Sequence, residues 1–361
     1  MIRYGIIGSG MMGQEHIRNI ALLPDAAVMA FVEPDPGMVA RTRALVPQAT
    51  HVADIATLLA RDDVDALLIA SPNHMHIGQL TQIAAIRPLP VLVEKPLYTD
   101  EAQLPDLERL MRAYSAPVWV AMEYRYMPPV QMFRDKVADA TGGIRMLTIR
   151  EHRFPFLEKV GDWNRFNRNT GGTLVEKCCH FFDLMRLILD DEPQRVMASA
   201  GQAVNHRDER YDGQTPDIWD HGYVIVDFAR GARAMLELCM FAEGSRYQEE
   251  ISAVGPTGKI EALVPGPTRF WNVEAGPAPT PQVIISPRNP TVPIAHDVPV
   301  DPALLAAGDH NGATFYQHQG FLDCIRTGRR PDVTLRDGAQ AVAMGRAAQR
   351  SAQTGQSVSL D

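Results

Sequence analysis

The sequence predicts an α/β protein with two domains: a doubly wound parallel sheet, followed by an α+β domain with a large, mostly antiparallel open sheet. In the first third of the chain, short apolar runs alternate with helix-like segments, which is typical of repeated βαβ units. After about Met122, alternating apolar runs succeed one another with few helices between them, which favours an antiparallel or mixed sheet. At 361 residues the chain is long enough for two cores, and we place the domains at 1–122 and 123–361.

A glycine-rich turn joins the first predicted strand to the first predicted helix. Residues 4–7 form a short apolar run typical of a buried parallel strand, and a helical pattern begins after the turn. The turn reads G-x-G-x-x-G, in which the first glycine permits a tight bend, the second lets backbone approach a pyrophosphate, and the third lets the helix pack on the strand. The helix N-terminus would face the phosphates. We therefore predict a Rossmann domain that binds a dinucleotide through Gly8, Ser9, Gly10, Met11, Met12 and Gly13.

The residue that ends the second apolar run indicates which dinucleotide is bound. This run, residues 27–32, is followed by Glu33, which lies 20 positions after Gly13, where an acid that holds the adenine ribose 2′-hydroxyl is expected. A carboxylate there repels a 2′-phosphate, and Arg41 and Arg43 come only later, in the next predicted helix. The sequence therefore predicts NAD as the cofactor, in preference to NADP.

The remaining elements of the first domain bring three strand ends to one crevice. In a doubly wound parallel sheet, ligands bind beyond the carboxyl ends of the strands. Residues 71–76, 94–96 and 123–125 follow three predicted strands and should meet there. After Glu33, the predicted elements are helices at 36–45, 55–60, 76–86 and 102–114, and strands at 50–52, 64–70, 91–93 and 118–121.

The second domain is predicted to be mainly β-structure, with a long excursion rich in proline and glycine between residues 263 and 312. The excursion contains short apolar runs, so we expect short strands there rather than disorder. The last helix of the chain could pack back on the first domain. The predicted strands lie at 144–153, 196–203, 222–229, 232–239 and 247–254, and the predicted helices at 175–189, 314–326 and 337–352.

Composition and charge narrow the functional class. The net charge of −8 argues against a nucleic-acid partner. The four cysteines, two of them adjacent, fit neither a disulfide framework nor a zinc site, and Cys178 and Cys179 are interpreted as small core residues. No apolar stretch is long enough to span a bilayer, and the chain begins directly on its first strand, so we expect a cytoplasmic protein without a membrane partner.

Several blocks, in order and over essentially the whole length, carry a resemblance to a known family. They are the glycine-rich turn 8–13, Ser71-Pro72-Asn73-His74-Met75-His76, Glu94-Lys95-Pro96, Tyr124-Arg125-Tyr126, residues 171–183 with Glu176 and His180, 321–328 and 331–338. On these blocks the chain resembles the Gfo/Idh/MocA oxidoreductases, the group of glucose–fructose oxidoreductase and inositol dehydrogenase. The resemblance implies a nicotinamide-dependent dehydrogenase acting on a sugar or cyclitol. Further cofactor contacts are then expected from Ser71, Pro72, Asn73, His76, Glu94, Lys95 and Arg125.

Three residues are the candidates for catalysis. The resemblance makes Lys95 a residue that touches both cofactor and substrate, and a lysine at a strand's carboxyl end can point its ammonium at a substrate oxygen. Glu176 and His180 are four apart on an apparent helix, hence on one face. Imidazole titrates in the range needed to remove a hydroxyl proton. The family usually has Asp in place of Glu176, and Gly is frequent at the position of Cys178.

The substrate wall and the reaction type complete the expectations. The substrate-binding residues are predicted to be Lys95, Arg153, Trp163, Asn164, Arg165, Glu176 and His180. The histidine pairs His74/His76 and His310/His318 lack a metal-ligand pattern, so no metal is expected. Redox-neutral sugar chemistry with a retained NAD (epimerase or glycosidase type) and a non-catalytic sensor are the alternatives to a dehydrogenase. The apolar residues of the second sheet favour a homodimer or homotetramer.

Overall fold

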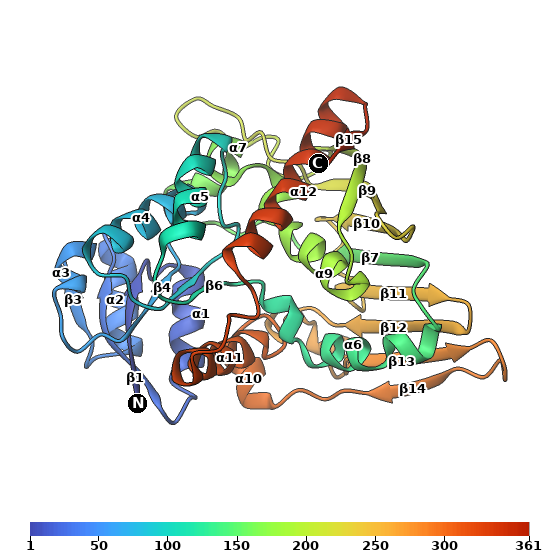
Figure 1. Cartoon of the computed structure of the whole chain (residues 1–361), viewed down its shortest axis with the longest axis horizontal. Coiled ribbons are helices and arrows are strands. Elements are labelled where there is room, and N and C mark those ends of the chain that lie inside the picture. The colour runs from blue at the N-terminus through green and yellow to red at the C-terminus, as the bar shows by residue number, and fades with distance from the viewer. Residues whose placement is uncertain (361) are drawn as a thin grey trace.

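The first lobe of the protein contains a six-stranded parallel sheet (Figure 1). The computed structural model describes residues 1–360; residue 361, the last of the second predicted domain, lies outside the described part. Strand order is β3-β2-β1-β4-β5-β6, and every neighbouring pair is parallel, so the predicted doubly wound sheet is confirmed. The strands are β1 (Ile2–Ile7), β2 (Ala26–Val32), β3 (Thr50–Val52), β4 (Ala66–Ile69), β5 (Val91–Val93) and β6 (Val118–Val120).

The helices of this lobe begin at local signals in the sequence. Asp35 accepts a hydrogen bond from the Met38 amide at 2.8 Å and is followed by Pro36, a combination that favours a helix start. Asp54 likewise accepts a hydrogen bond from the Thr57 amide, at 2.7 Å, at the start of the next helix. The helices are α1 (Met11–Ile20), α2 (Pro36–Leu45), α3 (Ile55–Leu59), α4 (His76–Ile86) and α5 (Leu104–Ala113), and the bounds of α2 and α4 are the predicted ones.

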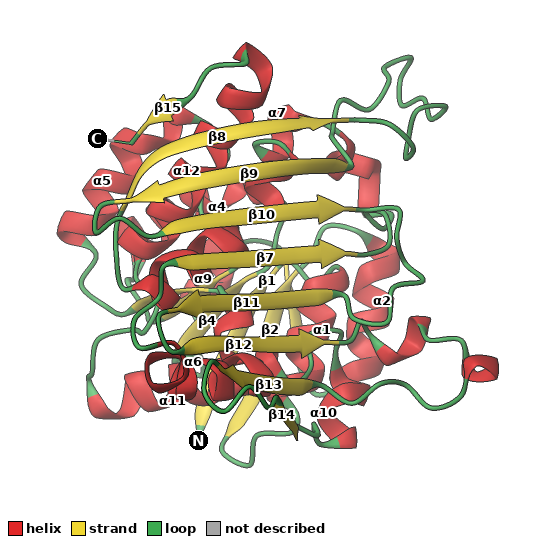
Figure 2. Ribbon diagram, turned by 90° about the vertical axis from the view of Figure 1, so that its right-hand side faces the viewer, coloured by secondary structure: helices red, strands yellow, loops and turns green. Residues whose placement is uncertain are grey.

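The second lobe is built on a nine-stranded sheet in the order β14-β13-β12-β11-β7-β10-β9-β8-β15 (Figure 2). Only β7 and β10 are parallel neighbours, which makes the sheet mixed but mostly antiparallel, as predicted. The strands are β7 (Met146–His152), β8 (Pro193–Gly201), β9 (His221–Phe228), β10 (Arg233–Cys239), β11 (Glu249–Gly255), β12 (Gly258–Val264), β13 (Gln282–Pro287), β14 (Ile294–Asp297) and β15 (Val358–Ser359).

Helices cover one face of this sheet and leave the other open. Behind the sheet in Figure 2, α6 (Pro128–Thr141) packs on β12 and β13, and α12 (Leu335–Thr354) packs on β8 and on α9 (Cys179–Leu189). Side chains alternate along the strands, with Leu147 and Val224 buried beneath the helices and their neighbours Met146 and Tyr223 exposed on the opposite face. The open face is turned toward the viewer in Figure 2.

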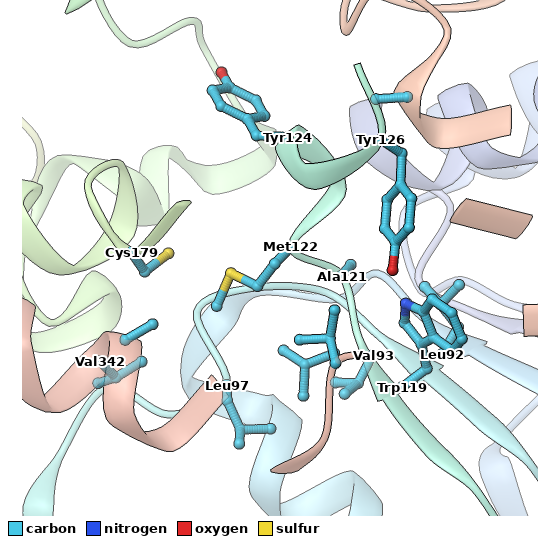
Figure 3. Packing of buried hydrophobic residues seen from close by; sticks show 14 of the residues in the cluster. Leu92, Val93, Leu97, Trp119, Ala121, Met122, Tyr124, Tyr126, Cys179 and Val342 are labelled. Atoms are coloured by element: carbon cyan, nitrogen blue, oxygen red, sulfur yellow. The ribbon is translucent and has the colours of Figure 1, made fainter. Parts of the chain in front are cut away.

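The two lobes are joined by buried contacts from the C-terminal helices. Helix α11 (Ala313–Thr327) packs against α1, and α12 packs against β6 of the first sheet. In Figure 3, Val342 of α12 lies beside Leu97, while Met122 lies between Cys179 of the second lobe and Ala121 at the end of β6. All five of these side chains are buried in one continuous hydrophobic cluster. The last long helix thus packs against both lobes.

Several elements differ from the prediction. The helix predicted at 175–189 is two helices, α8 (Thr173–Glu176) and α9, separated at Lys177 and Cys178. Residues 258–264 form β12, an interior strand of the sheet that was not predicted although its buried apolar positions alternate. Helix α6 was not predicted, because its two prolines at the start resemble a loop, although proline suits the first turn of a helix. Helices α7 (Asn167–Thr170) and α10 (Pro302–Ala307) and strands β14 and β15 are too short to leave a periodic pattern.

Candidate active site

A cleft of about 1080 Å³ lies at the carboxyl ends of the strands of the first sheet. Its size is at the upper end of the range typical of small-molecule sites, which suits a long ligand such as a dinucleotide. The first lobe lines it with the glycine turn, Glu33, the Ser71 loop and Lys95, and the second lobe closes it from the other side. The second-lobe residues on the cleft are Leu157, Glu158, Lys159, Val160, Trp163, Thr268, Arg269, Leu305, Ala306, Gly308 and Asp309.

The glycine turn has the shape that phosphate binding requires. Gly8 has a positive φ of +85°, and a Cβ on it would lie 2.6 Å from the Ser71 amide nitrogen. A Cβ on Gly13 would lie 2.4 Å from the Gly8 carbonyl oxygen, so this glycine allows α1 to pack on the turn. Around Gly10, in contrast, the described residues leave the space within 4 Å of a Cβ open. Helix α1 starts at Met11, so its first amides face this open space, and the turn fits a pyrophosphate.

Glu33 lines the cleft at the end of β2 and is held in place by backbone amides. It accepts hydrogen bonds from the Ser9 amide at 2.7 Å and from the Asp35 amide at 3.0 Å. Ser9 itself is buried behind the turn, where it accepts a hydrogen bond from the Thr42 hydroxyl at 2.7 Å. Arg41, which the sequence placed farther along the next helix, also lines the cleft. The negative charge of Glu33 and the positive charge of Arg41 therefore both face a ligand bound at the end of β2.

The Ser71 loop connects the cleft wall to the catalytic candidates. Ser71, Pro72 and Asn73 line the cleft, and the Asn73 amide group donates to Glu176 of the second lobe at 3.0 Å. His76 is fully buried behind this wall, with its ring nitrogens 2.9 Å from the Pro96 carbonyl oxygen and 3.0 Å from that of Ser71. Burial lowers the pKa of His76. The ring lies between two loops of the cleft, and as a neutral imidazole it donates a hydrogen bond to one of these two carbonyl oxygens.

A buried chain of hydrogen bonds fixes the residue before Lys95. Glu94 lies 2.8 Å from His16 Nε2, His16 Nδ1 lies 2.9 Å from His318 Nε2, and His318 Nδ1 lies 3.1 Å from the Tyr4 hydroxyl. An ionised Glu94 accepts the proton of His16 Nε2, so His16 accepts from His318, and His318 accepts from Tyr4. With one proton in each of these three hydrogen bonds, both ring nitrogens of His16 and of His318 have a partner. His318 is thus a structural residue that ties α11 to the strand end carrying Lys95.

Lys95 and Glu176 meet at the junction of the lobes. Lys95 lines the cleft, and its Nζ donates to the Glu176 carbonyl oxygen at 3.2 Å. Burial acts to lower the pKa of Lys95, but the surrounding acidic groups, including the Glu176 and Glu94 carboxylates, outweigh it and raise the pKa. The ammonium therefore stays charged at neutral pH. The Glu176 side chain turns to Asn73 and to Lys159, whose Nζ lies 3.7 Å away.

His180 has surroundings different from those of Glu176, because the break between α8 and α9 separates them. Its ring stacks on Tyr124 with centroids 4.2 Å apart and planes 5° apart. Nε2 lies 3.6 Å from Glu123 Oε1, and Nδ1 is buried with no hydrogen-bond partner in residues 1–360. Burial, reinforced by the positive charge of Lys95, lowers the pKa of His180 well below 6.5. The imidazole is therefore a neutral group with a free acceptor nitrogen.

Two acidic residues, Glu123 and Glu15, were not predicted as site residues, and His310, which contacts both, was only a weaker candidate from the sequence. Glu123 is almost fully buried, and among the described residues neither of its carboxyl oxygens has a hydrogen-bond partner. His310 lies with Nε2 3.8 Å from Glu123 Oε1 and with Nδ1 2.7 Å from Glu15 Oε1. Glu15 lines the cleft. The position of Glu123 at a strand end was visible in the sequence, but its pairing with His180 and with the distant His310 was not.

The remaining predicted substrate residues divide into two groups. Trp163 lines the cleft, with the Lys159 ammonium 4.6 Å from its ring centroid. The side chains of Arg153, Asn164 and Arg165 instead bond to other residues of the second lobe. Arg153 pairs with Glu151 at 3.4 Å, Asn164 donates to the Leu157 carbonyl oxygen at 3.0 Å, and Arg165 pairs with Glu209 at 3.0 Å. These bonds shape the loop that carries Lys159.

Arg125 and the cysteines lie behind the site. Arg125 forms a bidentate ion pair with the buried Asp183 and donates to the Asp332 carbonyl oxygen, so it braces the base of the second lobe. Burial raises the pKa of Cys178 well above 9 and that of Cys179 to about 12, which leaves both as neutral thiols. Within residues 1–360, no three His, Cys, Asp or Glu side chains are grouped to hold a metal ion. No helix in that range is long and apolar enough to cross a membrane.

Comparisons with known proteins match both lobes. Residues 2–122 match the family described as "Oxidoreductase family, NAD-binding Rossmann fold", and residues 138–360 match its "C-terminal alpha/beta domain". An inositol 2-dehydrogenase of Leifsonia xyli subsp. xyli is 31% identical over 274 residues, which cover 75% of this chain and 76% of that protein.

Two solved structures share the fold of the whole chain. A putative myo-inositol dehydrogenase from Sinorhizobium meliloti 1021 superposes with a TM-score of 0.79 at 21% identity, covering 100% of both chains. A levoglucosan dehydrogenase in complex with NADH and levoglucosan superposes with a TM-score of 0.80 at 20% identity, covering 99% of both chains. The chain thus belongs to the Gfo/Idh/MocA family of oxidoreductases, and its first lobe is an NAD-binding Rossmann domain.

Proposed function

We propose that the protein is an NAD-dependent dehydrogenase that oxidises a secondary hydroxyl of a neutral sugar or cyclitol. The observation that carries this proposal is the contact of Lys95, which lines the cleft, with Glu176, which also contacts Asn73. The neutral His180 follows on the next helix, where the positive charge of Lys95 contributes to lowering its pKa. Relatives named as inositol 2-dehydrogenases support the substrate class. Trp163 offers a ring face that suits a hydroxylated ring.

Each residue has a role that follows from its surroundings. When bound, NAD supplies the hydride acceptor. His180 takes the hydroxyl proton, because it is neutral and has a free nitrogen. The charged Lys95 stabilises the negative charge that develops on the substrate oxygen. Glu176 faces Asn73 and Lys159 rather than the imidazole, which favours a role in holding a neighbouring substrate hydroxyl.

A substrate screen tests the proposal. The purified protein is incubated with NAD+ or NADP+ and with myo-inositol, levoglucosan, aldoses of both hands, a sugar phosphate and a uronate, while the absorbance of the reduced cofactor is followed. Reduction with a neutral polyol is the expected result. Activity confined to sugar phosphates or uronates would contradict the neutral substrate, since Lys95 and Lys159 would then be anion-binding residues.

Glu33 should determine the choice between the two cofactors. Its carboxylate is fixed by two amides and repels a 2′-phosphate, so we expect kcat/KM to favour NAD+ by at least ~10-fold, equivalent to ~1.4 kcal/mol. Glu33→Ala should narrow this preference, because Arg41 on the same cleft is then unopposed. Steady-state kinetics with both cofactors measure the effect. Equal or better efficiency of the wild-type protein with NADP+ would show that Arg41 dominates.

A redox-neutral reaction with a retained cofactor is the second candidate, and the cover of the cleft favours it. The segment at Ala307–Asp309 crosses the first helix of the Rossmann domain, where Arg18 donates to the Ala307 carbonyl oxygen at 3.0 Å and the Asp309 amide donates to Glu15 at 3.2 Å. Arg269 pairs with Asp309 across the same face. Nucleotide released only when the purified protein is denatured, with product formed but no reduced cofactor accumulating, would identify this chemistry.

We also propose that the open face of the second sheet is the contact of a homodimer or homotetramer. Met146, Tyr223, Ile225 and Val254 are each between 38% and 60% exposed there, an unusual concentration of apolar surface for a monomer. Light scattering at micromolar concentration should give at least twice the mass of 39.9 kDa. Tyr223→Glu together with Ile225→Lys should reduce it to the monomer mass. A stable wild-type monomer would rule this interface out.

A further inference from the structure

A turn of the second lobe carries Lys159 to the wall of the cleft. The Lys159 side chain lines the cleft, and its carbonyl oxygen accepts a hydrogen bond from the Asp162 amide at 2.9 Å. Gly161 and Asp162 have positive φ values of +69° and +50°, so the chain reverses direction directly after Lys159. The backbone of this turn therefore fixes the point from which the lysine reaches the cleft.

Trp163 fixes the direction of the Lys159 side chain. Lys159 Nζ lies 4.6 Å from the centroid of the indole ring, a distance at which the face of an aromatic ring attracts a cation. The indole lies edge to face with His74 of the first lobe, with ring centroids 6.5 Å apart, and the Trp163 carbonyl oxygen accepts a hydrogen bond from Asn169 at 2.9 Å. The lysine is thus held at the junction of the lobes by contacts within the protein.

The carboxylate that faces Lys159 is too far away for a direct hydrogen bond. Glu176 Oε2 accepts a hydrogen bond from the Asn73 side chain at 3.0 Å, whereas Oε1 lies 3.7 Å from Lys159 Nζ. This second distance is about one ångström longer than a hydrogen bond between an ammonium and a carboxylate. Only 4% of the Glu176 side chain and 21% of the Lys159 side chain are exposed, so the pair is shielded from most of the solvent.

A hydroxyl group has the chemistry that this gap requires. Its oxygen accepts a hydrogen bond from an amino group while its proton is donated to a carboxylate, so one hydroxyl can bond both Lys159 and Glu176. An anionic group in the same place would be repelled by Glu176, and a cationic group by Lys159. The gap therefore favours a neutral group that both donates and accepts, as a sugar or cyclitol hydroxyl does.

The hydroxyl in this gap differs from the one that is oxidised. An oxygen that loses its proton becomes negative, and the Glu176 carboxylate would oppose that charge. The positive charge of Lys95 suits the reacting oxygen instead, and Lys95 Nζ bonds the carbonyl oxygen of the same Glu176 at 3.2 Å. Lys95 and Lys159 thus both contact one residue, which places the substrate oxygens that they bind close together. Hydroxyls on adjacent ring carbons are close in this way.

We propose that Lys159 and Glu176 together bind the substrate hydroxyl next to the one that is oxidised, so that the substrate is a ring with a free vicinal diol. This inference rests on the proposed function, because it presumes a polyol whose reacting hydroxyl faces Lys95. Lys159 donates to the neighbouring oxygen, and Glu176 accepts its proton in a hydrogen bond. Both bonds are present before and after hydride transfer, so Lys159 determines specificity and takes no part in the chemical step.

Calorimetry on the protein saturated with NADH tests the inference without turnover. The probes are myo-inositol and levoglucosan, each with its monodeoxy and monodeoxyfluoro analogues, which lose one hydroxyl at a time. Loss of the bridging hydroxyl should weaken binding at least ~10-fold in the wild type, since hydrogen bonds to charged groups are the stronger ones. In Lys159→Met the same loss should weaken binding about 3-fold or less, because one of the two bonds is already absent. The fluoro analogue should bind as weakly as the deoxy analogue, because it has no proton for Glu176.

Kinetics and two further variants complete the test. For a probe that is oxidised, kcat/KM should show the same dependence on the bridging hydroxyl, and this hydroxyl should be adjacent to the oxidised carbon. Lys159→Arg keeps a donor and should restore part of the discrimination. Lys136→Met, on α6, removes a lysine outside the cleft and should discriminate as the wild type does.

The outcomes separate this inference from the proposed function. If Lys159→Met weakens the binding of every analogue by the same factor, Lys159 only shapes the loop, and the inference falls while the dehydrogenase proposal stands. Dependence on a hydroxyl that is not adjacent to the oxidised carbon would overturn the vicinal diol. If the probes bind with the expected dependence on Lys159 and no polyol is oxidised, the dehydrogenase proposal falls and the binding role of Lys159 stands. If no polyol of the screen binds or is oxidised, both fall.

Discussion

His180→Ala is expected to lower kcat for polyol oxidation by roughly 10²–10⁴-fold, the range typical for losing a general base. The imidazole is neutral at pH 7 and its Nδ1 has no other hydrogen-bond partner among the described residues, so its removal takes away the group able to accept the hydroxyl proton. NAD binding should persist, because the glycine turn and Glu33 belong to the other lobe. The residual rate should increase with pH without a plateau, since hydroxide then replaces the imidazole.

Steady-state kinetics and a cofactor titration by fluorescence measure this effect together. His296→Ala, on β14 at the edge of the second sheet, is the matched control and should retain full activity. His180→Gln keeps more of the packing against Tyr124 and should be as inactive as the alanine variant. Near-normal turnover of either His180 variant, with an unchanged pH profile, would place the base elsewhere.

The first lobe was predictable because local signals and periodicity agree in it. Asp35 with Pro36 and Asp54 each mark a helix start, and the buried strands β4 and β5 are short runs of Val, Leu and Ile between turn residues. The glycine turn has a spacing that few other structures require. These features depend on neighbours within a few residues of one another, so the sequence alone indicates them.

The second lobe and the details of the site depend on contacts between distant residues. Whether Glu176 and His180 share a helix depends on the break at Lys177, whose ammonium bonds Tyr124 at 2.6 Å and pairs with Glu151 at 2.8 Å. Neither partner is near Lys177 in the sequence. Lys159 was overlooked for the same reason, because only the folded loop brings it within 3.7 Å of Glu176.

Three polar residues that were predicted to contact substrate also depend on contacts between distant residues. The sequence indicates that Arg153, Asn164 and Arg165 lie in the right segment, but it cannot indicate that each is already bonded within the second lobe. His76 and Arg125 likewise fasten the walls of the site rather than lining it. A motif therefore locates the region of a site, whereas the direction of each side chain is set by packing.

Lys95→Ala is expected to lower kcat by roughly 10²–10⁴-fold, a loss comparable to that of His180 but with a different cause. The ammonium lines the cleft and keeps its proton, because the acidic groups around it hold its pKa above the ordinary value despite burial. It therefore supplies a fixed positive charge where the substrate oxygen becomes negative, and such preorganised charges contribute more to the transition state than to the ground state. In the alanine variant, the fall in kcat should accordingly be larger than the rise in KM.

The readouts separate this role from that of a base. Because Lys95 provides charge rather than proton transfer, kcat/KM of Lys95→Ala should still rise with pH, at a lower level and displaced to higher pH, since the charge of Lys95 lowers the pKa of His180 and of Glu123. Lys95→Arg keeps the charge but not the compact geometry, so it should recover only part of the rate. Lys136→Ala, on α6 of the second lobe, is the control and should match the wild type. If Lys95→Ala instead raises KM with kcat unchanged, Lys95 binds substrate and transition state equally and does not stabilise the developing alkoxide.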